Sequence, residues 1–145
     1  MIRLISTSEL DILSSDPVRP HIPKIDVGKQ VYVLDDLSAV VCICYCTQVP
    51  STEQELEQYR NDTGSIAVAY TVWSNKPGAG RTIVNKLLEL MKAKENVYRL
   101  VTLSPLTEMA EKFHVRNGAT RISQSNTCQN FEYIIDENDI FGVPV

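Results

Sequence analysis

The stretch "SIAVAYTVWSNKPGAGRTIVNKLLELMKAK" (residues 65–94) joins two hydrophobic patterns through a glycine-rich turn. Its first nine residues are mostly apolar, with β-branched and aromatic side chains, which predicts a buried β-strand. Its last part repeats apolar residues at helical spacing, which predicts an amphipathic helix. The segment "NKPGAGRT" (75–82) therefore lies where a strand passes into a helix. Because a helix N-terminus gathers unpaired backbone N–H groups, such a loop suits a phosphate.

Three classes of protein hold a phosphate with a glycine-rich loop before a helix, and the spacing excludes two of them. A nucleotide P-loop requires GxxxxGK[ST], but alignment on Gly80 puts Asn75 at the first glycine and Arg81 at the lysine. A dinucleotide fingerprint GxGxxG fits Gly78 and Gly80 but meets Ile83 where its third glycine should stand. Neither nucleotide pattern is present.

The loop of the third class fits the sequence. The run "NKPGAGRTIVNKLLELM" (75–91) resembles the acetyl-coenzyme A pyrophosphate loop of the GCN5-related N-acetyltransferase (GNAT) superfamily, whose pattern is Q/R-x-x-G-x-G/A. Gly78 and Gly80 match its two small positions, and Arg81 is the basic residue that often follows. Asn75 departs from the usual Gln or Arg.

A second motif lies at the right distance downstream. The segment "AEKFHVRNGA" (110–119) resembles the family pattern A-x-x-[FL]-Y-x-x-x-G-[FA]. It matches the pattern at Ala110, Phe113, Gly118 and Ala119. His114 stands where the family usually has a tyrosine. The resemblance covers about residues 65–135, and the first sixty residues match no motif.

The resemblance implies direct transfer of an acetyl group from acetyl-coenzyme A to an amine of a small molecule or peptide. Backbone N–H groups of the 76–82 loop would hold the pyrophosphate, with added charge from Lys76 and Arg81. Free N–H groups near Val72 and Trp73 would pair with the pantetheine. The residues expected to bind the cofactor are Val72, Trp73, Asn75, Lys76, Gly78, Ala79, Gly80, Arg81, Thr82 and Ser104.

His114 occupies the family's general-acid position and is the candidate catalytic residue. An imidazolium gives a proton to a leaving thiolate more readily than a phenol does. The alternative is a partly buried helix histidine without a chemical role. The general base is not visible, because "AVAYTVWS" (67–74) contains no carboxylate. Glu53, Glu55 and Glu57 are candidates from an acidic helix, although solvated helix charges are the commoner explanation for such residues. A water that carries the proton away is the remaining alternative.

The remaining patterns predict the fold class. Strands are expected over 2–6, 30–34, 39–47, 97–103, 119–123 and 130–135, and helices over 7–13, 51–59 and 108–117. Three prolines between residues 17 and 23 predict an irregular loop. We expect one α/β (α+β) domain over 1–145, with a GNAT-like mixed, mostly antiparallel sheet of about six or seven strands and helices on both faces.

The composition and charge of the chain limit the kinds of partner that we expect. The chain has 145 residues, 43% hydrophobic and 22% charged, which is typical of a folded domain, and its net charge of −4 offers no general attraction to nucleic acid. No apolar run is long enough to span a membrane, so we expect a cytoplasmic protein. The cysteines of "VCICYC" (41–46) share one face of a strand, and we expect buried thiols and no metal. The apolar ending "IFGVPV" (140–145) suits packing on the domain or on a second copy.

Two other functions compete with the transferase. The missing strand glutamate and the substituted tyrosine favour a GNAT-fold binding or structural module with weak or no catalysis. A nucleotide hydrolase is the third hypothesis, and it would need an acidic Mg²⁺ ligand at a strand end. Neither "AVAYTVWS" nor "VYRLVTL" (97–103) supplies one.

Overall fold

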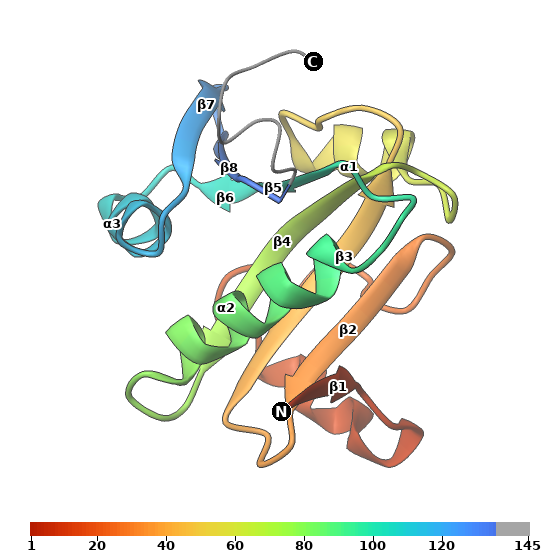
Figure 1. The fold of residues 1–145 in the computed structure, drawn as a ribbon, viewed down its shortest axis with the longest axis vertical. Helices are drawn as coiled ribbons and strands as arrows, with labels where there is room; N and C mark the ends of the chain where they lie inside the picture. Colours follow the sequence, from red (N-terminus) through yellow and green to blue (C-terminus); the bar gives the residue numbers. More distant parts are fainter. Residues whose placement is uncertain (136–145) are drawn as a thin grey trace.

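The computed structural model describes residues 1–135, which form one eight-stranded sheet with helices on both faces (Figure 1). Its strands are β1 (Ile2–Leu4), β2 (Lys29–Leu34), β3 (Ala39–Cys46), β4 (Ile66–Ser74), β5 (Arg99–Thr102), β6 (Ser104–Pro105), β7 (Thr120–Gln124) and β8 (Cys128–Tyr133). Its helices are the 3-10 helix η1 (Thr7–Ser15) and the α-helices α1 (Glu53–Tyr59), α2 (Ala79–Lys92) and α3 (Glu108–Arg116).

The strands lie in the order β1-β2-β3-β4-β5-β8-β6, with β7 paired to β8 beside this path. Within residues 1–135 only β4 and β5 run parallel, because α2 crosses between them, so the sheet is mixed and mostly antiparallel as predicted. It has more strands than the six or seven expected. Ser104 and Pro105 do not simply end β5, since they pair with Gln129 and Cys128 of β8 as a short separate strand.

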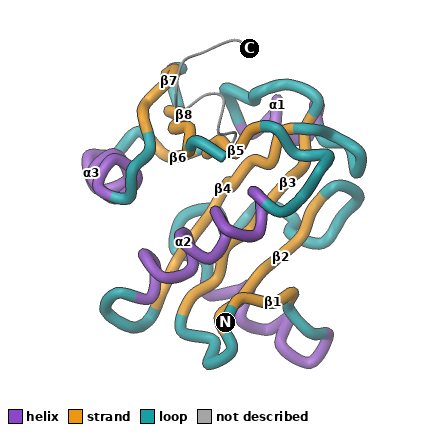
Figure 2. Tube along the Cα trace, viewed as in Figure 1, coloured by secondary structure: helices purple, strands orange, loops and turns teal. Residues whose placement is uncertain are grey.

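The core has one layer on each face of the sheet. On one face, α2 packs Ile83, Leu87 and Met91 against inward side chains of β2, β3 and β4. On the other face, Leu56 of α1 and the partly buried residues of η1 pack against the alternate side chains of the same strands. Figure 2 shows α2 crossing in front of β3 and β4. Helices on both faces are therefore confirmed, and α2 begins three residues earlier than its apolar pattern indicates.

β3 is buried along its whole length, as its apolar sequence predicted. Cys42, Cys44 and Cys46 all point into the layer covered by α1, and each is a free thiol. Among residues 1–135, no group of His, Cys, Asp and Glu side chains is arranged to hold a metal ion. Cys42, Cys44 and Cys46 are fully buried, so these thiols pack in the core as expected.

β4 carries one extra residue relative to β3. Cys42 pairs with Thr71 and Ile43 pairs with Ala69, so Tyr70 is left over and forms a β-bulge. The bulge breaks the alternation of faces, because Tyr70 packs on the α1 side and the next residue, Thr71, still bonds to a group on that side. This irregularity lies in the part of β4 that borders the site described below.

The proline-rich loop after η1 is irregular, as predicted, and is held by a buried ion pair. Lys24 Nζ lies 3.0 Å from the Asp16 carboxylate, and these side chains are only 4% and 0% exposed. Asp16 Oδ1 accepts the N–H groups of Val18 and Arg19 and the hydroxyl of Thr71 on β4. These bonds fix the loop against the bulged strand.

Gly64, in the turn before β4, lies too close to β3 for any side chain. A Cβ added there would be 2.5 Å from the carbonyl oxygen of Cys46. We expect Gly64→Ala to destabilise the protein by about 1–3 kcal/mol, because backbone must shift to make room. Urea denaturation measures this difference. Asp62→Ala, an exposed change in the same turn, is the control and should leave the midpoint unchanged; an unchanged midpoint for Gly64→Ala would contradict the close contact.

None of the helices within residues 1–135 is both long enough and apolar enough to cross a membrane. The predicted packing of the ending 140–145 lies outside the described residues.

Candidate functional site

The two parallel strands separate halfway along their length. Their pairing ends at Ala69 and Thr102, after which Leu103 N–H donates one last bond to the Ala69 carbonyl. β4 continues to Ser74, whereas the chain after β5 turns away and pairs with β8. Among the described residues, the far half of β4 therefore has no strand on this side, and the two elements splay apart.

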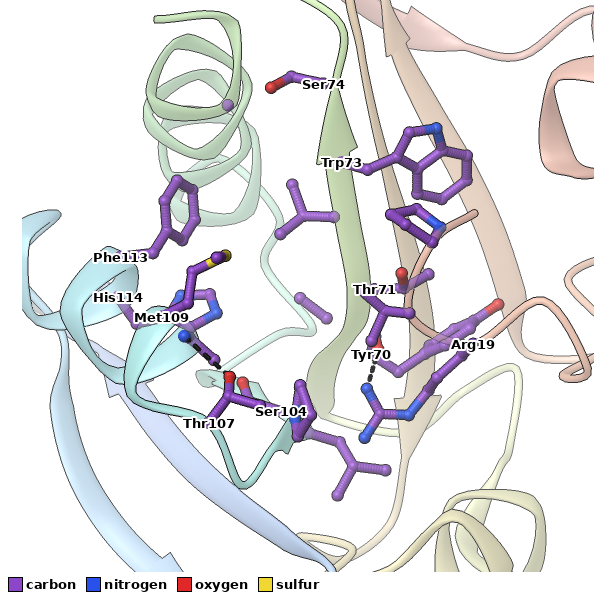
Figure 3. Close-up of a pocket in the computed structure, with 18 residues that line it drawn as sticks. Arg19, Tyr70, Thr71, Trp73, Ser74, Ser104, Thr107, Met109, Phe113 and His114 are labelled. Atoms are coloured by element: carbon purple, nitrogen blue, oxygen red, sulfur yellow. Dashed lines mark hydrogen bonds between the residues drawn. The ribbon is translucent and has the colours of Figure 1, made fainter. Parts of the chain in front are cut away.

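A cavity of about 340 Å³ fills the splay. Residues 69–74 of β4 form one wall, and residues 103–105 with the facing side of α3 form the other. Residues 17–19, in the proline-rich loop after η1, close one end of the cavity. Figure 3 shows Met109, Phe113 and His114 on the α3 side, facing Thr71 and Trp73 across the opening.

The hydrogen-bond register decides which N–H groups of β4 face the cavity. Asn75 N–H donates to the Ser38 carbonyl, so this pair belongs to the β3 ladder. Since alternate residues of a strand point in opposite directions, Trp73 is bonded towards β3 as well, and Val72 and Ser74 present their N–H groups to the splay. The sequence predicted free N–H groups near Val72 and Trp73, and the register places them at Val72 and Ser74.

The glycine-rich loop is built as a helix start. Gly78 adopts φ +84° as the N-cap of α2, a conformation that favours glycine. The N–H groups of Gly80 and Arg81 lie in the first turn, where no intrahelical acceptor exists. Gly80 also borders the cavity, and a Cβ on it would lie 3.3 Å from the Phe113 ring. The α2 N-terminus thus opens onto one end of the splay.

The predicted cofactor residues divide between two hollows. Val72, Trp73, Gly80 and Ser104 line the splay cavity, together with His114. Lys76, Gly78, Ala79 and Thr82 line a second hollow of about 480 Å³, on the side of the 34–38 turn. Asn75 and Arg81 line neither, and Lys76 lies 3.9 Å from the Asp36 carboxylate.

His114 lies on the buried side of α3 and is 6% exposed. Burial lowers its pKa to about 4, so at pH 7 only about one molecule in a thousand carries an imidazolium. The charged form on which the general-acid argument depended is therefore scarce. Its catalytic role stays a prediction, but a neutral ring is what the cavity contains.

Arg19 is the cavity residue that sequence reasoning missed. Its side chain is 3% exposed, and Nη1 donates to the Tyr70 carbonyl, which the bulge leaves outside the β3 ladder. Nε donates to Glu53, and Nη2 lies 3.6 Å from Cys128 Sγ. One arginine between two prolines gives no local signal of burial, since only the tertiary fold brings it to β4.

The carboxylates predicted as bases do not reach the cavity, and no Asp or Glu lines it within residues 1–135. Glu53 binds Arg19 and exposed His21, Glu57 binds buried Lys29, and Glu55 accepts the N–H of Ser51. The carboxylates of this acidic helix thus form ion pairs and hydrogen bonds that stabilise the fold. They are therefore described by the interpretation as solvated or structural charges and not by that as bases.

No protein-family model and no curated protein sequence matches the chain. Solved structures do match it. The GNAT-like decarboxylase GphF, in complex with isobutyryl-CoA, superposes with a TM-score of 0.73 at 11% identity, over 94% of this chain and 100% of that one. The aminoglycoside acetyltransferase AAC(6')-Ib, in complex with coenzyme A, gives 0.69 at 12% identity, over 99% of each chain.

The loading GNATL domain of CurA from Lyngbya majuscula matches with a TM-score of 0.68 at 11% identity, over 93% of this chain and 97% of that one. These proteins share the architecture of the chain but have little sequence similarity to it. The chain therefore has the GNAT fold, as its two motifs predicted.

Proposed function

We propose that the protein binds an acyl-coenzyme A and transfers the acyl group to an amine. The observation that carries the proposal is the splay between β4 and β5, which forms a cavity that opens directly onto the N-terminus of α2 at Gly80. A phosphate group suits the helix end, and a narrow pantetheine arm suits the largely apolar cavity. The N–H groups of Val72 and Ser74 would continue the β4 ladder by bonding to that arm.

The reaction is a displacement at the thioester carbon. The neutral amine attacks that carbon, a C–N bond forms, and the C–S bond breaks. The amine nitrogen loses one proton and the departing thiolate gains one, so no outside reactant is consumed. No carboxylate of residues 1–135 lines the cavity to take the amine's proton, and we propose that water or the acceptor itself carries it.

The proposal also covers the identity of the acyl donor and of the acceptor. Acetyl-coenzyme A is our first choice of donor, and a small-molecule or peptide amine is the acceptor. The named neighbours carry different groups, since GphF was captured with isobutyryl-CoA and AAC(6')-Ib acetylates aminoglycosides by name. An apolar cavity wall does not oppose a branched acyl chain, so donors should be compared rather than assumed.

Decarboxylation of a carboxylated acyl-coenzyme A is the second candidate, favoured by one feature of the cavity. As far as the described part of the chain forms it, the lining has no carboxylate but includes the cationic side chain of Arg19, which suits an acyl group that itself carries a carboxylate. In that reaction the bond between the α-carbon and the carboxylate breaks, CO₂ leaves, and the electron pair forms a thioester enolate, which takes a proton at carbon from water. GphF is described as a decarboxylase.

A paired assay separates these functions. We expect millimolar acetyl-coenzyme A to raise the melting temperature, and an amine panel of polyamines, aminoglycosides, amino acids and peptides to release free coenzyme A. A thiol reagent reports that release cleanly, because all four cysteines are buried. With malonyl-coenzyme A, CO₂ release without an amine would instead support decarboxylation. No thermal shift with any of these thioesters would contradict both, and a shift without turnover would leave the inactive binding module.

A further inference from the structure

Among the residues that the structure describes, the imidazole of His114 has one polar contact, inside an aromatic cage. Nδ1 lies 2.7 Å from the hydroxyl of Tyr133 on β8. Phe131 stacks on the ring at 5.4 Å between centroids, and Phe113 meets it edge-on at 5.1 Å. Tyr133 is the titratable group among these neighbours, and its own ring is edge-on at 5.8 Å. The cavity lies on the remaining side of the imidazole.

The short contact can be formed in two ways. Either the Tyr133 O–H donates to the lone pair of Nδ1, or Nδ1–H donates to the phenol oxygen. Within residues 1–135 the Tyr133 hydroxyl has no second hydrogen-bond partner, and the residue is 4% exposed. The second arrangement would therefore bury the hydroxyl hydrogen without an acceptor, whereas the first satisfies both groups. Burial also raises the pKa of Tyr133, which keeps its proton in place.

We infer that Tyr133 is a positioning residue that holds His114 as the Nε2–H tautomer, so that the ring offers the cavity a neutral hydrogen-bond donor. The inference rests on the proposed function, because the acceptor of this donor would be the thioester oxygen of the acyl-coenzyme A. Negative charge develops on that oxygen during attack, and a fixed N–H aimed at it stabilises the charge. His114 then acts by polarising the carbonyl rather than by giving up a proton.

This role removes the conflict between the position of His114 and its charge. A general acid must be protonated before the reaction, and burial makes the imidazolium rare at neutral pH. An Nε2–H donor is present in the neutral ring itself. Turnover supported by His114 should therefore not fall as the pH rises through 6.5, where an ordinary histidine loses its proton.

The tautomer can be read directly by NMR on the intact protein labelled with ¹⁵N-histidine. The chain has two histidines, and exposed His21 serves as the internal reference. We expect His114 to show a protonated Nε2 and an unprotonated Nδ1 at pH 7. A protonated Nδ1 would overturn the inference without the need for any variant.

Tyr133→Phe tests the direction of the bond. A bond from the tyrosine to Nδ1 exists only with neutral imidazole, so its loss should raise the pKa of His114, by about half a unit to one unit. A bond from Nδ1–H to the tyrosine favours the imidazolium, so its loss would lower that pKa and contradict the inference. Tyr45→Phe, which removes another buried hydroxyl bonded to Gln30, should leave His114 unchanged.

The same variants separate this inference from the proposed function. If acyl-coenzyme A binds, Tyr133→Phe should lower kcat about three- to tenfold with KM unchanged, and Tyr45→Phe should change neither. An unchanged kcat in Tyr133→Phe would overturn the positioning role. Absence of any thioester binding to the wild type would instead contradict the proposed function, while the NMR result would still decide the tautomer.

Discussion

Replacing Gly80 with glutamate is expected to abolish the binding of acyl-coenzyme A while the chain still folds. Gly80 lies in the first turn of α2 and borders the cavity, with the Phe113 ring only 3.3 Å from where a Cβ would lie. A side chain there occupies the junction between helix end and cavity. Its carboxylate also repels the pyrophosphate that the helix end would attract, and the two effects should weaken binding at least about 100-fold.

This variant should lose some stability, because Gly80 is buried against Phe113, and the favourable place of a carboxylate in the first turn of a helix offsets that loss only in part. Calorimetric titration with acetyl-coenzyme A measures the affinity, and the melting temperature without ligand reports the fold. Asn85→Glu adds the same charge one turn further along the exposed side of α2 and is the matched control. If Gly80→Glu binds the thioester as tightly as Asn85→Glu does, the α2 N-terminus is not the phosphate site.

Replacing Asp16 with asparagine is expected to destabilise the protein by about 3–5 kcal/mol, because it leaves Lys24 charged and buried without its partner. Both side chains are almost inaccessible, and Asp16 also fixes the loop by accepting bonds from Val18, Arg19 and Thr71. Asparagine keeps the shape of the side chain, so the loss reports charge and hydrogen bonding rather than a cavity. Urea denaturation gives the free energy of unfolding.

Asp35→Asn is the control, since this carboxylate is 58% exposed in its ion pairs with Arg3 and the N-terminus. Such exposed pairs contribute about 0–1 kcal/mol. The double variant Asp16→Asn with Lys24→Met should recover part of the loss, because no unpaired charge remains buried. A single Asp16→Asn variant as stable as Asp35→Asn would show that the buried pair does not hold the loop.

The same carboxylate predicts how stability depends on pH. Burial raises the pKa of Asp16, but hydrogen bonds from the Arg19 and Val18 N–H groups, Lys24 and Thr71 outweigh it and hold the pKa below its ordinary value. A folded pKa below the unfolded one means that the contribution is complete above about pH 4 and is lost as pH falls through the folded value. Asp16→Asn should therefore flatten the acid side of the stability curve.

The order of elements could be predicted from sequence because each one has a strong local pattern. The helical stripe of Ile83, Leu87 and Met91 and the apolar run of β3 each indicate one structure, and both are confirmed. The capping residue Thr52 likewise marks the start of α1, where it accepts the Glu55 N–H. Short elements were harder, because two residues such as Ser104 and Pro105 form a strand only when β8 lies beside them.

The candidate site was predictable only in part. Gly78 marks the start of α2 because its positive φ favours glycine, and Gly80 marks it because a side chain there would crowd Phe113. Residues 110–119 supplied the second motif. Arg19 reaches the cavity only through the fold of a proline-rich loop, which no short pattern encodes. The burial of His114 comes in part from Phe131 and Tyr133 of β8, up to 19 residues along the chain, so motif spacing alone did not indicate that burial lowers its pKa.

The extra residue in β4 has a consequence for how the strand tolerates change in length. The register between β4 and β3 shifts by one residue between Ala69 and Thr71. The numbering of the residues that face β3 therefore changes from one side of Tyr70 to the other. Removing Tyr70 alone would restore an unbroken ladder, because Ala69 and Thr71 would become consecutive residues opposite Ile43 and Cys42. Residues 71–74 would keep their partners, and the N–H groups of Val72 and Ser74 would still face the cavity. A chain one residue shorter would thus keep its candidate binding edge and lose the carbonyl that accepts the Arg19 side chain.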